Sequence, residues 1–208
     1  MKKITTLAAI VAMTAMALSS CSGSGSDKDS LFGSLPGEYA EMMAEEAKLK
    51  EKATKITTEA EKAKFIEESQ KLNEKWSAKL EKSAQKLDGK EINLSSDGQF
   101  KVTSPVSLTL DKIGSKDLSM QFKVTGGAEA AEPITIANAY TTSRAVFIAG
   151  YDENGTELFK SPIGQVTGTA NGADLEIPAG TPVQFSTLSF NKKYVEEYPL
   201  VKTLKLTM

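Results

Sequence analysis

The sequence contains no histidine, and cysteine, arginine and tryptophan each occur only once among its 208 residues. Without histidine, neither a Ser-His-Asp triad nor most zinc and iron sites can be built. One cysteine excludes an internal disulfide, and one arginine is unlike the basic clusters of nucleic-acid readers. We therefore expect no nucleic-acid partner, no metal, no cofactor and no enzyme of the common kinds. Carboxylate or lysine chemistry is the enzymatic alternative that remains.

The single cysteine, Cys21, directly follows a short apolar segment. Lys2 and Lys3 give this segment a basic start, and residues 4–18 are mainly apolar. Its length is below the roughly 20 residues that a membrane-spanning helix needs. A basic start, an apolar centre and small residues before a cleavage point are typical of a secretory signal. The sequence therefore predicts a signal peptide over residues 1–20.

The end of this segment, Leu18-Ser19-Ser20-Cys21, resembles the lipobox of bacterial lipoproteins. In that family the cysteine receives a diacylglyceryl group and becomes the first residue of the mature chain. The resemblance implies that Cys21 is lipidated and that this lipid makes the membrane a partner. It also implies a place in the bacterial cell envelope, at the outer membrane, with the periplasmic and the surface face both open.

Residues 21–33 are small and polar, which predicts a flexible tether behind the lipid. Two short stretches in it resemble features of Bacteroidota lipoproteins. The acidic neighbourhood of Asp27-Lys28-Asp29 is similar to a surface-export signal. Asp29-Ser30-Leu31 fits an O-glycosylation pattern of Asp, then Ser or Thr, then an apolar residue, which makes Ser30 the candidate acceptor. A plain solvated linker is the alternative.

Residues 34–88 are rich in Ala, Glu, Lys and Leu, with no Gly or Pro between Glu38 and Asp88. This composition predicts a long, charged amphipathic helix. Its apolar stripe changes face between Ala63 and Phe65, so one unbroken coiled-coil seam is not expected. Either the helix bends, or it turns back near residues 69–73 as a helical hairpin, or its two halves pack against different partners.

Two roles are open for this helical segment. Residues 38–87 carry eleven Glu and eleven Lys, and this balance disfavours a membrane-surface helix, whose polar face is usually rich in Lys and Arg. The segment is then either a charged spacer or a surface that binds a partner or a second copy. The second functional hypothesis is accordingly a stalk that forms homo-oligomers through residues 34–88.

From residue 89 onward the pattern is that of β-strands. Apolar and polar residues alternate from Leu118 to Val124, and turn residues recur about every ten positions. Asn154-Gly155 predicts a hairpin, with a calcium site at Asp152 as the alternative, and Asn171-Gly172 predicts a second hairpin. We therefore expect an immunoglobulin-like β-sandwich over residues 89–208 and, for the chain, an α+β fold by segments.

Two segments carry a family resemblance: Val146-Phe-Ile-Ala-Gly-Tyr-Asp-Glu-Asn-Gly-Thr-Glu-Leu158 and Ile177-Pro-Ala-Gly-Thr-Pro-Val-Gln-Phe185. They resemble FxLYD-type and telokinin-like extracytoplasmic domains, in which an apolar strand ends in Tyr-Asp or a similar pair before a glycine turn. The chain departs from that family at Ile148 and Gly150, where an aromatic residue and a leucine are usual. The resemblance implies an immunoglobulin-like fold with binding or assembly roles in the envelope, and no reaction.

The leading hypothesis is a non-enzymatic binding or assembly module that recognises another envelope protein or a glycan. The candidate contact residues are Tyr151, Tyr194, Tyr198 and Arg144. Tyrosine buries a large area at low entropic cost, although packing in the core is the alternative for each of them. Arginine forms bidentate pairs that lysine cannot replace, although a structural salt bridge is the alternative for Arg144.

Overall fold

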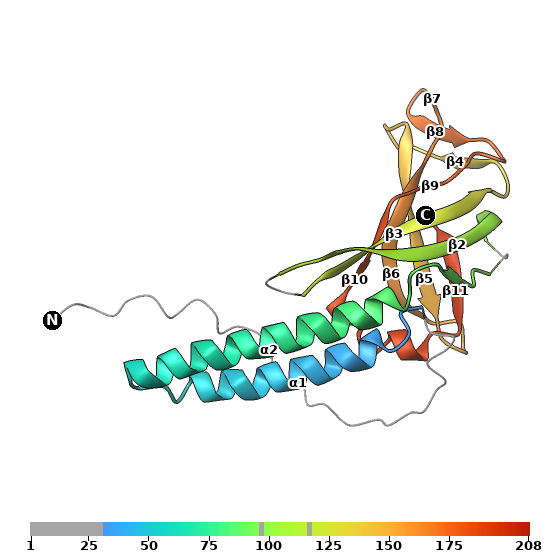
Figure 1. Ribbon diagram of the computed structural model, residues 1–208. Coiled ribbons are helices and arrows are strands. Elements are labelled where there is room, and N and C mark those ends of the chain that lie inside the picture. The colour runs from blue at the N-terminus through green and yellow to red at the C-terminus, as the bar shows by residue number, and fades with distance from the viewer. Residues whose placement is uncertain (1–30, 96–97, 116–117) are drawn as a thin grey trace.

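The computed structural model describes residues 31–95, 98–115 and 118–208; Cys21, Ser30, the signal segment and most of the tether lie outside the described residues. Helices come first and a β-rich region follows (Figure 1), which confirms the predicted α+β order by segments. The helical elements are α1 (Leu35–Ala53), α2 (Glu59–Gln85), η1 (Lys192–Tyr194) and η2 (Tyr198–Leu200). The strands are β1 (Lys90–Ile92), β2 (Phe100–Ile113), β3 (Met120–Ala130), β4 (Ile134–Ile136), β5 (Ser143–Tyr151), β6 (Glu157–Thr167), β7 (Thr169–Asn171), β8 (Asp174–Ile177), β9 (Gln184–Phe185), β10 (Thr187–Phe190) and β11 (Thr203–Thr207).

The helical segment is a hairpin of two antiparallel helices (Figure 1) and not one long helix. The chain turns between Ala53 and Glu59, earlier than the position near residues 69–73 that the apolar stripe indicated. At the start of α2 the Thr58 hydroxyl accepts a hydrogen bond from the Glu61 N–H, and the Glu61 carboxylate accepts one from the Thr58 N–H. This capping box satisfies the first N–H groups of the helix without glycine or proline.

Polar side chains fix the register of the hairpin by reaching from one helix to the other. The cross-helix contacts join Ser83 to Glu38 at 2.8 Å, Lys79 to Glu41 at 2.8 Å, Lys75 to Glu45 at 2.8 Å and Lys52 to Glu68 at 3.2 Å. In each pair the two residue numbers add to about 120, as expected for one antiparallel register. The indole N–H of Trp76 also donates to Glu45 at 3.0 Å.

The near end of the hairpin packs into the same hydrophobic core as the strands; we call this junction the base. Helix residues such as Leu35, Met42 and Leu80 are fully buried in that core. The Tyr39 hydroxyl donates to the carbonyl of Leu118, just before β3. An aromatic cluster fills the base, and its members are Phe32, Tyr39, Phe122, Phe159, Phe190, Tyr194 and Tyr198. The expected boundary at residue 88 therefore does not divide the core.

Two antiparallel four-stranded sheets surround this core, in the orders β1-β2-β3-β10 and β11-β5-β6-β9. They join at both edges. The Ser186 N–H donates to Ile163 of β6 at 2.9 Å, while the Ser186 carbonyl accepts from Val124 of β3 at 3.1 Å. At the other edge the Ser95 N–H donates to Leu204 of β11 at 2.8 Å. An immunoglobulin-like sandwich consists of two sheets packed face to face. Here the two sheets are also hydrogen-bonded to each other through Ser186 and Ser95, so the immunoglobulin-like part of the expectation is not confirmed.

A small sheet, β4-β8-β7, lies at the end of the β region away from the hairpin (Figure 1); we call this end the tip. β7 and β8 join through Asn171-Gly172, where Gly172 has a φ of 64°. β5 and β6 join through Asn154-Gly155, where Gly155 has a φ of 78°. Both predicted hairpins are confirmed. Among the described helices, none combines the length and the apolar character needed to cross a membrane.

Candidate binding surface at the tip

The four predicted contact residues do not form one site. Arg144 lies near the start of β5, and Tyr151 is its last residue. Seven residues of extended strand separate them by about 23 Å, because a strand rises about 3.3 Å per residue. Tyr194 and Tyr198 belong to the aromatic cluster of the base. The structure therefore leaves Arg144 alone near the tip and places the tyrosines towards the other end.

Tyr198 is a core residue, with 1% of its surface exposed. Its ring packs edge-on against Phe159 and Phe32, at centroid distances of 4.9 and 4.8 Å, and its hydroxyl oxygen accepts a hydrogen bond from the Asn191 N–H at 3.2 Å. Burial raises the pKa of Tyr198 to about 12. The prediction of Tyr198 as a surface contact is therefore wrong, because the whole ring is packed inside the core.

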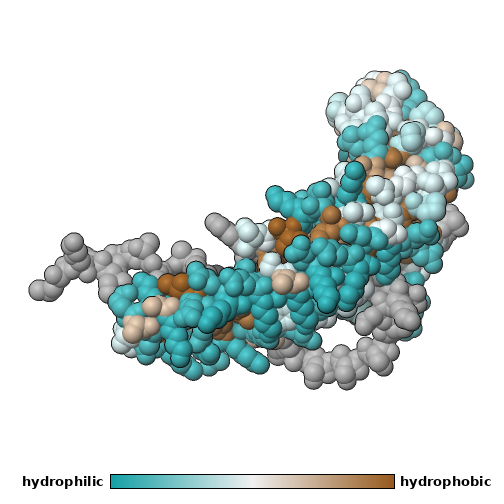
Figure 2. Space-filling view, in the orientation of Figure 1, coloured by the Kyte–Doolittle hydropathy of each residue, from teal (hydrophilic) through white to brown (hydrophobic). Residues whose placement is uncertain are grey.

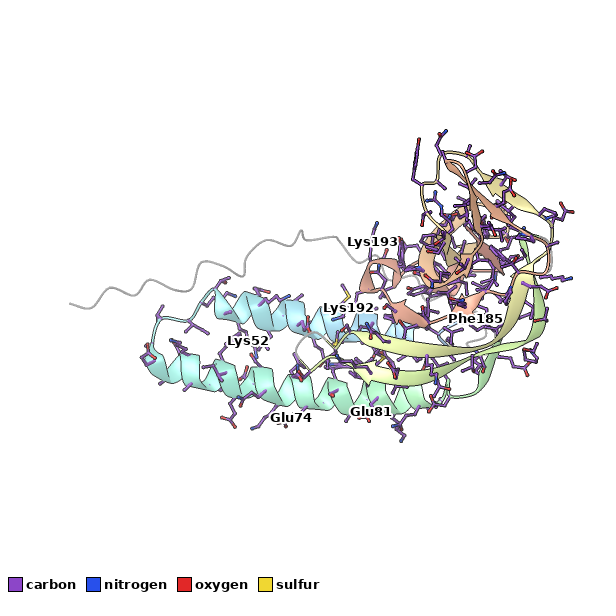
Figure 3. All side chains as sticks on the ribbon, turned by 90° about the horizontal axis from the view of Figure 1, so that it is seen from above. Lys52, Glu74, Glu81, Phe185, Lys192 and Lys193 are labelled. Atoms are coloured by element: carbon purple, nitrogen blue, oxygen red, sulfur yellow. The ribbon has the colours of Figure 1, made fainter. Side chains whose placement is uncertain are left out.

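Tyr194 and Tyr151 are half-buried. Tyr194 packs against Phe159 at 6.0 Å between ring centroids, and the Lys205 ammonium lies 5.7 Å from the centre of the Tyr151 ring. Figure 3 shows Lys192 and Lys193 of η1 beside the near end of α1. Both tyrosines thus have structural neighbours, and each offers only part of its ring to a partner.

Arg144 is exposed, and it forms no ion pair with any residue that the structure describes. Its backbone pairs with Val166 on β6. The structural salt bridge offered as an alternative for this residue is therefore not formed in the described part of the chain. The guanidinium remains available to a partner.

Tyr140 is the exposed aromatic residue that sequence reasoning missed. It is 80% exposed, and its backbone has a φ of 48°. The Tyr140 N–H donates to the carbonyl of Ala173 at 3.1 Å, and the N–H of Asn138, whose φ is 52°, donates to the Asp174 carboxylate at 3.0 Å. A left-handed conformation costs a residue with a side chain roughly 1–2 kcal/mol. The loop is therefore held by β8 and its turn in a conformation that tyrosine rarely adopts.

The two segments around Tyr140 carry no charged side chain of their own, and the Asp174 carboxylate lies at their edge. Residues 137–143 and 167–173 contain no Asp, Glu, Lys or Arg and consist of Ala, Asn, Gly, Ser, Thr and one Tyr. The N–H of Gly168 donates to the carbonyl of Thr142 at 2.9 Å, so the two segments are neighbours. Figure 2 shows the contrast, with a pale tip and a hairpin that is largely hydrophilic. Small uncharged residues between strands resembled ordinary turns, which is why the sequence did not reveal this surface.

Two shallow hollows lie on the described part of the chain. One, of about 530 Å³, runs between α2 and the end of β2, and the carboxyl groups lining it are Glu81, Asp88 and Asp111. The other, of about 420 Å³, is lined by Gln99, Pro133 and the β4 residues Ile134 and Thr135, so it borders the tip. Across residues 31–95, 98–115 and 118–208, no three acidic or sulfur side chains gather as a metal site would require.

The perturbed carboxylates have local structural causes. Hydrogen bonds from the Thr57 and Thr58 N–H groups and hydroxyls lower the pKa of Glu61 to about 2. At the β5–β6 turn, the Thr156 N–H lowers the pKa of Asp152, and the Asn154 N–H also donates to this carboxylate. Asp152 thus closes the hairpin turn. A comparison of the chain with protein-family models, with curated proteins and with solved structures finds no match.

Proposed function

We propose that this protein is a lipid-anchored, non-enzymatic binding or assembly module of the bacterial cell envelope, which recognises another envelope protein or a glycan. The proposal rests on the tip surface, where Tyr140 is 80% exposed and held in a costly conformation. Strained residues persist where the surrounding structure imposes them, and they concentrate at functional sites. A strained, exposed aromatic side chain is better explained by recognition than by folding.

The lipid on Cys21 would place the base towards the membrane. Leu31 and Phe32, where the described chain begins, are buried in the core of the base. Nine residues separate Cys21 from Leu31, and the tether that their composition predicts would reach on the order of 17 Å. The tip lies at the opposite end of the β region (Figure 1), so a partner could reach it without crossing the anchor.

Among the residues that the structure describes, no catalytic groups converge in the hollows, which favours binding over catalysis. Catalytic carboxylates and lysines usually show pKa values shifted by burial together with a charged partner inside a cleft. Here the lowered pKa values of the described carboxylates have structural causes, which are helix capping for Glu61 and a turn for Asp152. For Glu45 and Glu67 the cause is hydrogen bonding on the exposed hairpin, from Lys75 and Trp76 and from Lys71. The hollow beside α2 is shallow and open. Chemistry by carboxylates or lysines therefore stays the least supported hypothesis.

A shortened hairpin tests the proposal. The outer half contributes no buried residue between Met42 and Trp76, whereas deletion of all of residues 34–88 would open the core at the base. We therefore remove residues 46–74 and join Glu45 to Lys75, which face each other at 2.8 Å, through a short glycine-serine turn. Affinity capture from intact cells should retrieve the same partner with the shortened chain as with the full one. Loss of that partner would show that the outer half of the hairpin, and not the tip, binds it.

One observation favours the alternative of a self-associating stalk. Met43 and Ile66 in the outer half of the hairpin are 44% and 48% exposed, and two helices alone leave such side chains uncovered. Sedimentation of the full and the shortened chain tests this role. A stalk predicts oligomers that grow with concentration and disappear when residues 46–74 are removed. A β-region module predicts the same oligomeric state for both chains at every concentration.

For the β region we propose an immunoglobulin-like sandwich whose two sheets are joined at their edges. The two antiparallel four-stranded sheets around one core support the sandwich. Gly164 supports the joined edge, because a Cβ there would lie 2.4 Å from the Gln184 carbonyl oxygen, so only glycine lets β9 approach β6 this closely. Amide hydrogen exchange tests the edges: slow exchange at Ser186 and Ser95 is expected, and fast exchange at both would show open sheets.

A further inference from the structure

We propose that the tip binds a protein whose surface offers an apolar pocket for Tyr140 beside a carboxylate for Arg144. This inference rests on the proposed binding function and adds to it the chemical class of the partner and the two residues that anchor it. Tyrosine and arginine are the residue types that, with tryptophan, dominate the energetic centres of protein interfaces. At the tip they lie four positions apart in the chain, in the loop before β5 and near the start of that strand.

Tyr140 has the features of an anchor. Its N–H bond to Ala173 fixes the backbone, so the ring is presented by a supported loop. Of the other large apolar side chains that are exposed, Leu200 reaches 56% and Ile66 48%, against 80% for Tyr140. A ring held out of the core before association has little backbone freedom left to lose on binding.

Arg144 supplies the polar half of the recognition. Every other basic residue of the chain is a lysine, and only a guanidinium matches a carboxylate through two parallel hydrogen bonds. Arg144 has no ion pair with a described residue, and the seven residues that directly precede it in the chain, 137–143, carry no charged side chain. A carboxylate on the partner would therefore meet no competing group from that loop.

The surroundings favour a protein over a glycan. Interface centres are depleted in charged residues and enriched in Tyr and Arg, and small uncharged residues provide adaptable hydrogen bonds around them. The tip has this composition over residues 137–143 and 167–173. Neither Tyr140 nor Arg144 lines either of the two hollows described above, although one of them borders the tip at β4. An exposed ring that lies outside these hollows suits a partner that brings its own pocket.

Photocrosslinking in intact cells tests the inference with the full lipoprotein. The probe is p-benzoylphenylalanine, placed in separate chains at Tyr140, at Met43 on the hairpin and at Leu200 at the base, all of them exposed positions. Adducts are then digested with protease or treated with periodate, which separates protein from glycan. Two further substitutions are made in the chain that carries the probe at position 140. Arg144→Lys keeps the positive charge but removes the bidentate geometry. Lys202→Ala is the control, because it removes an exposed positive charge at the base, away from the tip.

The expected result is a protease-sensitive adduct from position 140 whose yield falls at least tenfold with Arg144→Lys and stays unchanged with Lys202→Ala. A glycan adduct from position 140, or a protein adduct indifferent to Arg144→Lys, would overturn the inference. Adducts only from Met43 or Leu200 would also overturn it while leaving a binding function in place. No adduct from any of the three positions would remove the proposed function itself.

Discussion

At the scale of single residues, the structure separates tyrosines that hold the fold together from one that does not. Tyr39 and Tyr198 are buried in the base, whereas Tyr140 is exposed in a left-handed backbone conformation. Since its ring contributes little burial, the conformational cost at this position is not repaid within the chain. A substitution at Tyr140 that tolerates the left-handed conformation should therefore weaken binding without lowering stability.

Tyr140→Asn is expected to leave the fold equally stable or to stabilise it by up to about 1 kcal/mol, because asparagine adopts the left-handed conformation more readily. Tyr140→Val serves as the matched control and should destabilise by about 1 kcal/mol, since a β-branched side chain tolerates that conformation worst. Urea unfolding of the three chains measures the difference. Equal stability of the Asn and Val variants would show that the loop stores no strain.

Gly150→Ala is expected to destabilise the protein by about 1–3 kcal/mol, the usual cost of overpacking a core. A Cβ at Gly150 would lie 2.2 Å from the Phe159 ring and 2.9 Å from the Val201 side chain, and Phe159 packs into the aromatic cluster of the base. Denaturant unfolding checks this. Gly37→Ala is the control, because a Cβ there meets no atom within 4 Å and position 37 lies in a helix.

At the scale of elements, the hairpin is held differently along its length. Near the base it is buried in the shared core, while its outer half relies on polar contacts such as Lys52–Glu68, with side-chain exposures of 66% and 36%. Exposed ion pairs stabilise by only about 0–1 kcal/mol each. The capping box of Thr58 and Glu61 is therefore an important local support of the outer turn.

The outer turn is expected to loosen in acid. The pKa of Glu61 is lowered from 4.5 to about 2, so its contribution is fully present above about pH 4.5 and is lost as the pH falls towards 2. An NMR titration of the Glu61 carboxyl carbon should give a midpoint near 2, and helical circular dichroism should fall over the same range. Glu61→Gln, which cannot titrate, should flatten that part of the dichroism change. A Glu61 midpoint near 4.5 would contradict the capping box.

At the scale of the whole molecule, helices and strands share one hydrophobic core that runs through the base without interruption. Phe32 precedes the hairpin in the chain, yet its ring lies 5.6 Å from Phe122 of β3 and 4.8 Å from Tyr198 of η2. The helices and the strands should consequently unfold together.

Phe32→Ala is expected to cost about 3–5 kcal/mol, as for other fully buried phenylalanines, and to lower the unfolding midpoint of helices and strands alike. Circular dichroism follows the helices, and amide exchange in β5 and β6 follows the strands. Phe65→Ala in the outer hairpin, where the ring is only half-buried, should cost much less and should leave the strands protected. Strands that stay folded after Phe32→Ala would show two independent units.

Local sequence signals predicted much of the element order. The Ala-Glu-Lys composition of residues 34–88 gave helices, and the positive φ available to Asn-Gly gave both hairpin turns. The capping box at Thr58 and Glu61 also has a local sequence signal, a Thr-x-x-Glu pattern, which marks the start of α2 without glycine or proline. Of the predicted contact residues, Arg144 is exposed as expected, while Tyr198 is not.

The sequence by itself determined where helices, strands and turns form, because these depend on neighbours within a few residues along the chain. Only the tertiary structure decided which tyrosine is buried, that the two sheets join at Ser186, and that the hairpin shares the core of the strands. Those outcomes depend on contacts such as that between Tyr39 and Leu118, 79 positions apart. Burial is a property of the packed chain, and no local pattern distinguishes an aromatic residue that finds a core from one that is held outside it.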